Sequence, residues 1–485
     1  MYNASQASHL KKEIMIRLIQ AFFSCAFAEN TRLISYDMRP KGSEVPFRCC
    51  VYKERAVIND RVIAGLGFSI ENINERVLLS EYAKHALNRE RPESNPLTVL
   101  EAACKGCSPE KIHVTDLCQG CIARSCQSTC KFDAIEIVNG RSIIDPAKCK
   151  NCKICIPACP YGAIVKISVP CENSCPVDAI KKDGMGRASI DFDKCLLCGK
   201  CVSACPFGAV HEKSQIIDIL KNMGSARKIV ALVAPAIVGQ FPGNLYQLKS
   251  AMINIGFDDV LEVAQGAEIT MQNEAHELKE KLENNEPFMT TSCCAGYNQF
   301  VRKHLPDIQP FVSKTKTPLH YIAEKVKQNE PDAITVFISP CSAKRVEVFE
   351  DNFIDYVMNF EELGALFIAK KIEILDYSEA YFEKECLEKA RNFAFSGGVA
   401  QAIESNFIKQ DTIKSCILNG LNKENIKFLK KIAKEKKCDE GNFIEVMCCE
   451  NGCIGGNATI NNPKTAKRLI SDFAKQKDSS NLASI

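Results

Sequence analysis

Sixteen of the 28 cysteines in this 485-residue chain fall between residues 104 and 205, and this clustering constrains the fold more than any other feature. The first twenty residues carry alternating charges and no long apolar core, so we expect no signal peptide and a cytoplasmic protein. In a reducing compartment, clustered cysteines are typical of metal binding rather than of disulfides. The sequence therefore predicts a protein that binds several metal groups.

Length and charge narrow the class further. A chain of 485 residues is too long for one hydrophobic core, so we expect several domains. The net charge of +3 predicts no nucleic-acid partner. No run of about 18 apolar residues occurs, so we expect no membrane span.

Two cysteine runs share the spacing C-x2-C-x2-C-x3-C followed by proline, which is the spacing of bacterial ferredoxins. Three thiolates on a tight loop can bind three corners of a 4Fe-4S cluster, and the fourth thiolate must come from elsewhere. We predict that each run takes its fourth ligand from the other run, as in bacterial ferredoxins. A zinc site is the alternative, but a doubled run followed by proline makes zinc the less suitable metal. The predicted sets are Cys149, Cys152, Cys155 and Cys205 for one cluster, and Cys195, Cys198, Cys201 and Cys159 for the other.

Looser copies of the same pattern surround these runs and indicate nested ferredoxin repeats. They supply enough thiols for two more 4Fe-4S clusters; we predict a third cluster, and the fourth and the partition of the ligands stay open. The array suits single-electron transfer, with a purely structural role as the alternative. The additional candidate ligands are Cys104, Cys107, Cys118, Cys121, Cys126, Cys130, Cys171 and Cys175.

The cysteine map and the hydrophobic pattern divide the chain into parts. Apolar, β-branched runs predict buried strands in an α/β part, where they alternate with helices. The predicted strands are 228–238, 334–338 and 443–447, and the predicted helices are 8–28, 71–88, 245–255 and 270–284, with a short strand and helix in 46–68. The predicted parts are a small α/β or α+β domain of unknown role (1–100), an α+β multi-cluster domain (101–225), an α/β domain (226–475) and a flexible tail (476–485).

Two further groups of cysteines need an interpretation. The adjacent Cys49 and Cys50 lack spaced partners, which is more typical of buried or incidental cysteines than of a metal site. Three distant segments carry cysteines in unusual settings, and none of them makes a four-ligand site alone. These segments are TSCC (291–294), PCSAKRVE (340–347) and MCCENGCIGG (447–456).

These three segments resemble, in order and separation, the signature stretches of FeFe-hydrogenases, written TSCCPxW, MPCxxKxxE and ExMxCxxGCxxG. The resemblance covers about residues 104–460 and implies an α/β catalytic domain of two lobes, with small parallel or mixed sheets around its catalytic H-cluster. It implies a 4Fe-4S cube on Cys294, Cys341, Cys449 and Cys453. Cys453 would also bridge to a two-iron subsite that carries CO, cyanide and a dithiolate.

The resemblance also assigns residues around the two-iron subsite. Lys344 would donate to a cyanide, Glu347 would orient this loop, and Met447 would lie beside the subsite. The resemblance places further residues against the subsite, and these are Ala234, Pro235, Ser396, Gly397 and Gly398.

A proton route follows from the same resemblance. Cys293 would be the free thiol beside the dithiolate, and Glu274 and Glu277 lie three apart on one face of a predicted helix. With Ser313 they match the family's relay in the order Glu277, Ser313, Glu274, Cys293. Solvated surface glutamates are the alternative interpretation.

The implied activity is a ferredoxin-linked, reversible interconversion of two protons and two electrons with H2. Maturation proteins would be further partners. Alternatives are an H2 sensor, a plain electron carrier, and a hydrogenase-like iron–sulfur assembly protein without the two-iron subsite. The chain departs from the family pattern near the catalytic cysteines, at Ala295, Tyr297, Thr317, Leu319, Ser339 and Cys448.

Overall fold

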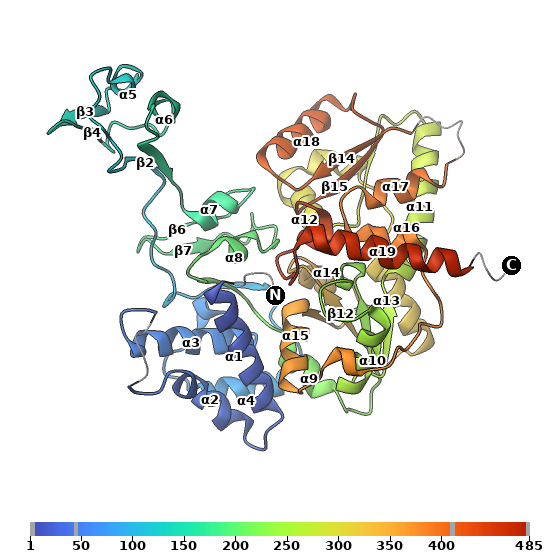
Figure 1. Ribbon diagram of the computed structural model, residues 1–485. Helices are drawn as coiled ribbons and strands as arrows, with labels where there is room; N and C mark the ends of the chain where they lie inside the picture. Colours follow the sequence, from blue (N-terminus) through green and yellow to red (C-terminus); the bar gives the residue numbers. More distant parts are fainter. Residues whose placement is uncertain (1–4, 43–46, 408–412, 482–485) are drawn as a thin grey trace.

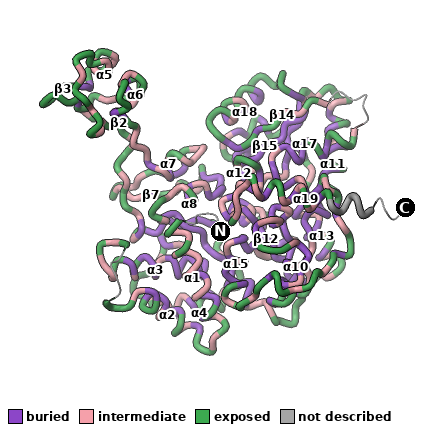
Figure 2. The backbone as a smooth tube through the Cα atoms, in the orientation of Figure 1, coloured by how far each residue is buried: buried purple, intermediate pink, exposed green. Residues whose placement is uncertain are grey.

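The computed structural model describes residues 5–42, 47–407 and 413–481, with side chains described as far as Lys475. Figure 1 shows a helical N-terminal domain, an extended arm of short hairpins and helices, and a larger α/β body. The tube in Figure 2 is mostly exposed along the arm and mostly buried inside the body. Within the described residues, no helix combines the length and apolar character needed to cross a bilayer.

The N-terminal domain is entirely helical in its described residues. In α1, apolar residues recur at helical spacing and are buried against α15, and the hydroxyl of Ser5 caps the first turn. The prediction of a strand in 46–68 was wrong, because this segment buries one helical stripe and forms α3. The helices are α1 (Gln6–Phe22), α2 (Phe27–Met38), α3 (Val51–Gly65) and α4 (Leu79–Asn88), with the short η1 (Ile70–Asn72).

Two small units of similar design follow, which we call the outer unit (residues 108–167) and the inner unit (residues 97–107 and 168–212). In each, two end strands pair antiparallel and enclose a hairpin and two short helices. The outer unit contains β2 (Lys111–Val114), α5 (Ser125–Ser128), β3 (Ile135–Val138), β4 (Arg141–Ile144), α6 (Cys155–Ala158) and β5 (Ile164–Ile167). The inner unit contains β1 (Leu97–Val99), α7 (Pro170–Ser174), β6 (Ile180–Lys182), β7 (Ala188–Ile190), α8 (Lys200–Ala204) and β8 (Val210–Glu212).

The outer unit is therefore an insertion within the inner unit. Strand β1 precedes the insertion, yet it pairs with β8, which follows it. Figure 1 shows the outer unit at the tip of the arm, while α7 and α8 of the inner unit lie nearer the body.

The α/β body contains two small parallel sheets, which confirms the mixed α/β fold expected from the strand and helix pattern. The first has the order β10-β9-β12-β13 and the second the order β11-β15-β14. The strands are β9 (Ile229–Val233), β10 (Asp259–Glu262), β11 (Met289–Thr290), β12 (Ile334–Ser339), β13 (Tyr356–Asn359), β14 (Ser415–Asn419) and β15 (Phe443–Met447).

Helices cover both sheets and complete the hydrophobic core. The longer ones are α10 (Leu245–Ile255), α11 (Ala264–Glu283), α12 (Ala295–His304), α13 (Pro318–Asn329), α15 (Phe360–Ala369), α18 (Lys423–Glu435) and α19 (Pro463–Asn481). The shorter ones are α9 (Ile216–Asn222), α14 (Lys344–Glu350), α16 (Glu388–Arg391) and α17 (Gly398–Glu404), with η2 (Pro235–Ile237), η3 (Pro306–Phe311), η4 (Ile374–Asp376), η5 (Asn392–Ala394) and η6 (Gly452–Gly455).

The flexible tail (476–485) stays a prediction, and the structure adds that its first part is helical. Helix α19 continues to Asn481, because lysine and glutamine are good helix formers even where the sequence is polar. Residues 482–485 lie outside the described residues.

Candidate metal centre

The cysteine-bearing segments of the body all follow the carboxyl ends of parallel strands. Strand β11 leads to Cys293 and Cys294, β12 leads to Cys341, and β15 leads to Cys449 and Cys453. In parallel sheets, ligand sites form where the carboxyl ends of strands open into loops. The fold therefore brings together segments that are up to 160 residues apart in the sequence.

The four predicted ligands of the cube lie within electrostatic range of one another. Burial, together with the neighbouring thiols of Cys294 and Cys449, raises the pKa of Cys453 to about 12. Burial and the same neighbours also raise the pKa of Cys341 and, with Cys449 as neighbour, that of Cys294. Such a group of thiols is difficult to ionise alone, and a bound cationic cluster stabilises the thiolates.

No three metal-binding side chains in the described residues converge on one point as they do around a single ion. In an iron–sulfur cluster each thiolate binds a different iron, so the sulfur atoms stand apart. The Cys453 turn also packs against the Cys341 loop. The two backbones approach so closely that a Cβ at Gly456 would stand 2.4 Å from the carbonyl oxygen of Pro340.

Lys344 supplies a buried cation at this centre. Its ammonium pairs with the carboxylate of Glu347 and lies 3.4 Å from the carbonyl oxygen of Cys293. Burial lowers the pKa of Lys344, but the Glu347 carboxylate outweighs this effect and holds it above its usual value. Thr317, one of the departures from the family pattern, donates its hydroxyl to the same carboxylate.

The four residues of the predicted relay lie near one another. The hydroxyl of Ser313 donates to Glu277 at 2.7 Å, and it also contacts the carboxyl group of Glu274. The backbone N–H of Ser292 donates to one oxygen of Glu274 at 3.2 Å, and the other oxygen is buried without a partner among the described residues. Burial raises the pKa of Glu274 to about 8.

Cys293 stands at the inner end of this set and Glu277 at the outer end. Burial and the nearby Glu274 carboxylate raise the pKa of Cys293 well above its usual value, so the thiol keeps its proton. The side chain of Glu277 is 15% exposed. The set therefore runs from the half-buried thiol of Cys293, beside the proposed cube ligands, to the partly exposed carboxylate of Glu277.

The remaining predicted neighbours line the same region. Met447 is buried at the end of β15, and Ala234 and Pro235 follow β9, which lies beside β12. The backbone N–H of Ser396 donates to the carbonyl of Asn451, so this loop packs on the turn that carries Cys449 and Cys453. The hydroxyl of Ser396 is buried without a partner among the described residues.

Glu445 is a residue that the sequence analysis missed. Its buried carboxylate accepts from the backbone N–H groups of Gly397 (2.6 Å) and Ala400 (2.8 Å), and so fixes this loop against β15. The signal was available, since one carboxylate inside the apolar strand FIEVM needs buried hydrogen-bond donors.

The predicted partition of the accessory ligands was wrong. Each C-x2-C-x2-C-x3-C run takes its partner from its own unit, because the β2–β5 and β1–β8 pairs close each unit on itself. Thus Cys159 and Cys205 lie in different units. Three groups each line one small hollow, and these are Cys130, Cys149, Cys152 and Cys155; Cys118, Cys121, Cys126 and Cys159; and Cys175, Cys195, Cys198 and Cys201. The remaining thiols pack in the core of the inner unit, where Cys171 lies near Cys205, and these are Cys104, Cys107, Cys171 and Cys205.

Backbone N–H groups point at the sulfur atoms in both units. The fourth residue after Cys130, Cys175 and Cys205 is an alanine, and its N–H donates to that sulfur at 3.2–3.4 Å. Hydrogen bonds of this kind stabilise cluster-bound thiolates and tune their potentials. The repeated C-x3-A rhythm of the sequence thus has a chemical purpose that fits iron–sulfur clusters.

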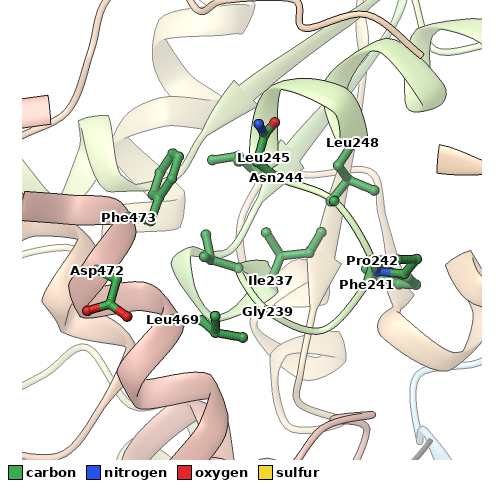
Figure 3. A pocket seen from close by; sticks show the side chains of 12 residues that line it. Ile237, Gly239, Phe241, Pro242, Asn244, Leu245, Leu248, Leu469, Asp472 and Phe473 are labelled. Atoms are coloured by element: carbon green, nitrogen blue, oxygen red, sulfur yellow. The ribbon is translucent and has the colours of Figure 1, made fainter. Parts of the chain in front are cut away.

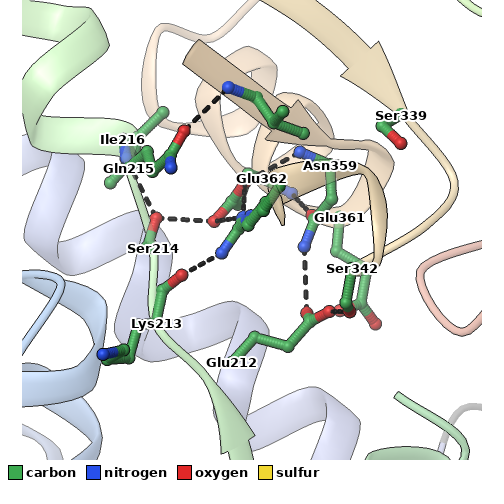
Figure 4. A network of polar contacts seen from close by, with 12 residues as sticks. Glu212, Lys213, Ser214, Gln215, Ile216, Ser339, Ser342, Asn359, Glu361 and Glu362 are labelled. Atoms are coloured by element: carbon green, nitrogen blue, oxygen red, sulfur yellow. Dashed lines mark hydrogen bonds and ion pairs between the residues drawn. The ribbon is translucent and has the colours of Figure 1, made fainter. Parts of the chain in front are cut away.

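A buried polar network joins the inner unit and the N-terminal domain to the loop that follows Cys341, and Figure 4 shows its part around Glu212, Ser342 and Asn359. Glu212, at the end of β8, accepts from Lys11 (3.1 Å), Asn359 (3.0 Å) and Asn457 (2.8 Å), and also from the hydroxyl of Ser342. Burial disfavours its charged form, but Lys11 and Arg345 hold the pKa of Glu212 well below its usual value.

A separate hollow of about 360 Å³ lies between the segment after Pro235 and helix α19 (Figure 3). Its lining includes Ile237, Leu245, Leu248 and Leu469, and no cysteine lines it. The hollow is therefore distinct from the cysteine centre.

Four cysteine groups in two ferredoxin-like units, beside a fifth group at parallel strand ends, define an iron–sulfur protein. Residues 227–457 match the family "Iron only hydrogenase large subunit, C-terminal domain". Residues 142–165 match a 4Fe-4S binding domain, and residues 165–216 match an LdpA Fe-S cluster-binding domain. Residues 227–457 therefore form a domain of the iron-only, or FeFe, hydrogenase family.

Curated relatives include both hydrogenases and assembly factors. The chain is 26% identical to iron hydrogenase 1 of Clostridium pasteurianum over 53% of this chain and 55% of that protein. It is 24% identical to a probable cytosolic Fe-S cluster assembly factor of Drosophila melanogaster over 44% of this chain and 56% of that protein. The chain thus spans about half the length of the curated relatives it matches.

Solved structures that the chain matches include an apo FeFe-hydrogenase variant from Chlamydomonas reinhardtii. It is 19% identical, with a TM-score of 0.44, and the match covers 53% of this chain and 88% of that chain.

Proposed function

We propose that the chain is an FeFe-hydrogenase that interconverts two protons and two electrons with H2. The observation that carries this proposal is the contiguous set Glu277, Ser313 and Glu274, which ends at the thiol of Cys293. A protein that only holds or transfers iron–sulfur clusters needs no proton route to a half-buried thiol beside its cluster ligands.

In this proposal, Cys294, Cys341, Cys449 and Cys453 hold the 4Fe-4S cube, and Cys453 also tethers the two-iron subsite. When bound, the subsite with its CO, cyanide and dithiolate ligands supplies the metal chemistry of hydrogen formation and cleavage. Lys344 offers a cation to an anionic ligand in this space. Met447, Ala234, Pro235, Ser396 and Gly397 would enclose it.

The protein's own groups move the protons. Cys293 gives a proton from its sulfur and regains one from the unpartnered oxygen of Glu274. Because the pKa of Glu274 is about 8, both its protonated and its ionised forms are accessible near neutral pH. Ser313 passes the proton between the two carboxyl groups, and Glu277 exchanges it with water at the surface.

Electrons enter at the outer unit and leave the inner unit toward the cube. Cys152 of the outer unit is exposed, which would bring one cluster close to a docked carrier. We propose four accessory 4Fe-4S clusters, one for each observed cysteine group, with ferredoxin or a similar small protein as the carrier. Maturation proteins would insert the two-iron subsite, and the proposed location is the cytoplasm.

The infrared spectrum of anaerobically matured protein tests the proposal. We expect bands from metal-bound CO and cyanide in the wild type, in Cys293→Ala and in a matched control, Cys386→Ala, whose buried thiol has Glu262, Glu268, Lys384 and Arg391 as its charged neighbours and no other cysteine among them. Only Cys293→Ala should lose hydrogen turnover. Missing bands under conditions that mature a known hydrogenase would overturn the proposal.

A cluster-assembly protein is the second candidate, because several matched relatives carry that name. Such a protein would bind the cube without the two-iron subsite. It would show iron–sulfur absorption and no CO or cyanide bands, and Glu274→Gln would leave its function unchanged.

A further inference from the structure

Cys448 is a buried thiol between two proposed clusters, and it is not among the proposed ligands. Its side chain packs in one buried cluster with Cys198, a proposed ligand in the inner unit, and it directly precedes Cys449, a proposed ligand of the cube. Cys448 is only 3% exposed. The Cys448 side chain therefore lies between the inner unit and the proposed cube.

The backbone of Cys448 is fixed from both sides. Its N–H donates to the sulfur of Cys294 at 3.4 Å, and its carbonyl accepts from the N–H of Leu421 at 3.1 Å. The ammonium of Lys200, two residues after Cys198, donates to the carbonyl of Leu421 at 3.1 Å. These hydrogen bonds fix the position of the inner unit relative to the Cys448 segment.

The surrounding chain makes room for this particular side chain. A Cβ at position 296 would stand 2.8 Å from the Cβ and 2.9 Å from the sulfur of Cys448, so Gly296 is required beside it. The loop of Cys198 docks tightly on the segment after Cys453, since a Cβ at Gly199 would meet the side chain of Asn457 at 2.4 Å. The space around the thiol is therefore closely filled on the side of Gly296.

One thiol carries one proton, but here it faces two sulfur acceptors. A thiolate bound to a reduced cluster is more negative than one bound to an oxidised cluster, and it accepts a hydrogen bond more strongly. Hydrogen bonds to cluster sulfur atoms are among the factors that set a cluster's reduction potential. The S–H of Cys448 should therefore turn toward whichever neighbouring cluster holds the electron.

We propose that Cys448 is a positioning residue that shares one hydrogen bond between Cys198 and Cys449 and thereby couples the reduction of the inner-unit cluster to that of the cube. The proposal rests on the cluster assignments of the proposed function, but not on hydrogen turnover. One electron passes between the two clusters at a time. The proton stays on the sulfur of Cys448, and no covalent bond forms or breaks.

Redox titration followed by electron paramagnetic resonance tests this role. The protein is loaded with iron and sulfide alone, without the two-iron subsite, as the wild type, Cys448→Ala and Cys448→Ser. We expect full iron content in all three, because Cys448 is not a ligand. Cys448→Ala should lower the midpoint potentials of both neighbouring clusters and weaken the dependence of one on the other. Cys448→Ser keeps an O–H donor and should recover part of the shift.

Cys386→Ala is the matched control, since it removes a buried thiol elsewhere in the body. Unchanged potentials in Cys448→Ala, or an equal shift in Cys386→Ala, would overturn the proposal. So would the loss of a cluster from Cys448→Ala, because Cys448 would then be a ligand. Failure of the proposed function would appear separately, as missing CO and cyanide bands in matured protein.

Discussion

The cysteine centre is bounded by two sides, which we call walls: one is formed by α11 and the segment before α13, and the other faces the inner unit. The two walls carry different kinds of side-chain atom. On the wall formed by α11 and the segment before α13, carboxyl and hydroxyl oxygens of Glu274, Ser313 and Glu277 lead from Cys293 to the surface. On the wall toward the inner unit, the centre meets the sulfur atoms of Cys198 and Cys448, with apolar packing around them. The first wall carries titratable oxygen, and the second carries closely spaced sulfur.

This difference separates a path for protons from a path for electrons, and a hydrogenase requires both. Protons need titratable groups within hydrogen-bonding distance of one another, whereas electrons need only closely spaced redox centres. If the proposed function is correct, a change on one wall should leave the other wall intact. Substitutions on each wall test that separation.

Replacing Cys293 by alanine should reduce hydrogen turnover by about a hundredfold or more, because it removes the first proton donor. The iron content and the potentials of the accessory clusters should stay as in the wild type. Turnover with a viologen dye and iron analysis measure both effects, with Cys386→Ala as the control. Near-normal turnover would remove Cys293 from the proton route.

Replacing Glu277 by glutamine should have a smaller effect, on the order of tenfold, because water can partly replace a group at the surface. Glutamine keeps a hydrogen-bond acceptor for Ser313 but cannot carry the proton. Glu280→Gln is the matched control, since Glu280 lies exposed on the same helix. Equal rates for the two variants would show that protons reach Glu274 by another path.

The pH dependence of hydrogen production should report Glu274. Its pKa is raised to about 8, so the proton is present below that pH and is lost as the pH rises through it. Production with a viologen donor should therefore fall by several-fold between about pH 7 and pH 9. A profile that rises over this range would contradict the assignment.

Asn457→Ala should act on the second wall alone. Asn457 donates to Glu212 at 2.8 Å and accepts from the N–H of Ser342 at 3.1 Å, so its loss leaves buried polar groups unsatisfied. We expect the free energy of unfolding to fall by about 1–3 kcal/mol, measured as a lower thermal midpoint. Asn273→Ala, at an exposed position, should change it little. An equal effect of both variants would argue against the docking role of Asn457.

Three of the seven strands described in the α/β body were predicted from the sequence, because their signal is local. The runs that became β9, β12 and β15 are short, apolar and β-branched, and each was placed within a few residues of its observed position. The resemblance supplied the residues of the relay, and the structure brings these residues together. The all-helical N-terminal domain was missed because the segment 46–68 mixes both periodicities.

Long-range choices were beyond the sequence. Two cysteine runs of identical spacing do not reveal which copy lies beside which, so Cys205 and Cys159 were exchanged between units. The contacts of Glu212 with Lys11, Ser342 and Asn457 join segments from four parts of the chain, and no local pattern marks them. The neighbours of Cys448 likewise depend on the docking of the inner unit.

The insertion of the outer unit within the inner unit has a consequence for biosynthesis. Residues 108–167 form one uninterrupted stretch, so the outer unit can fold as soon as the ribosome has released it. The inner unit must wait, because β1 at 97–99 cannot pair until β8 at 210–212 has been made. The growing chain would therefore complete its most exposed cluster sites first, while the thiols nearest the catalytic centre stay open to late iron delivery.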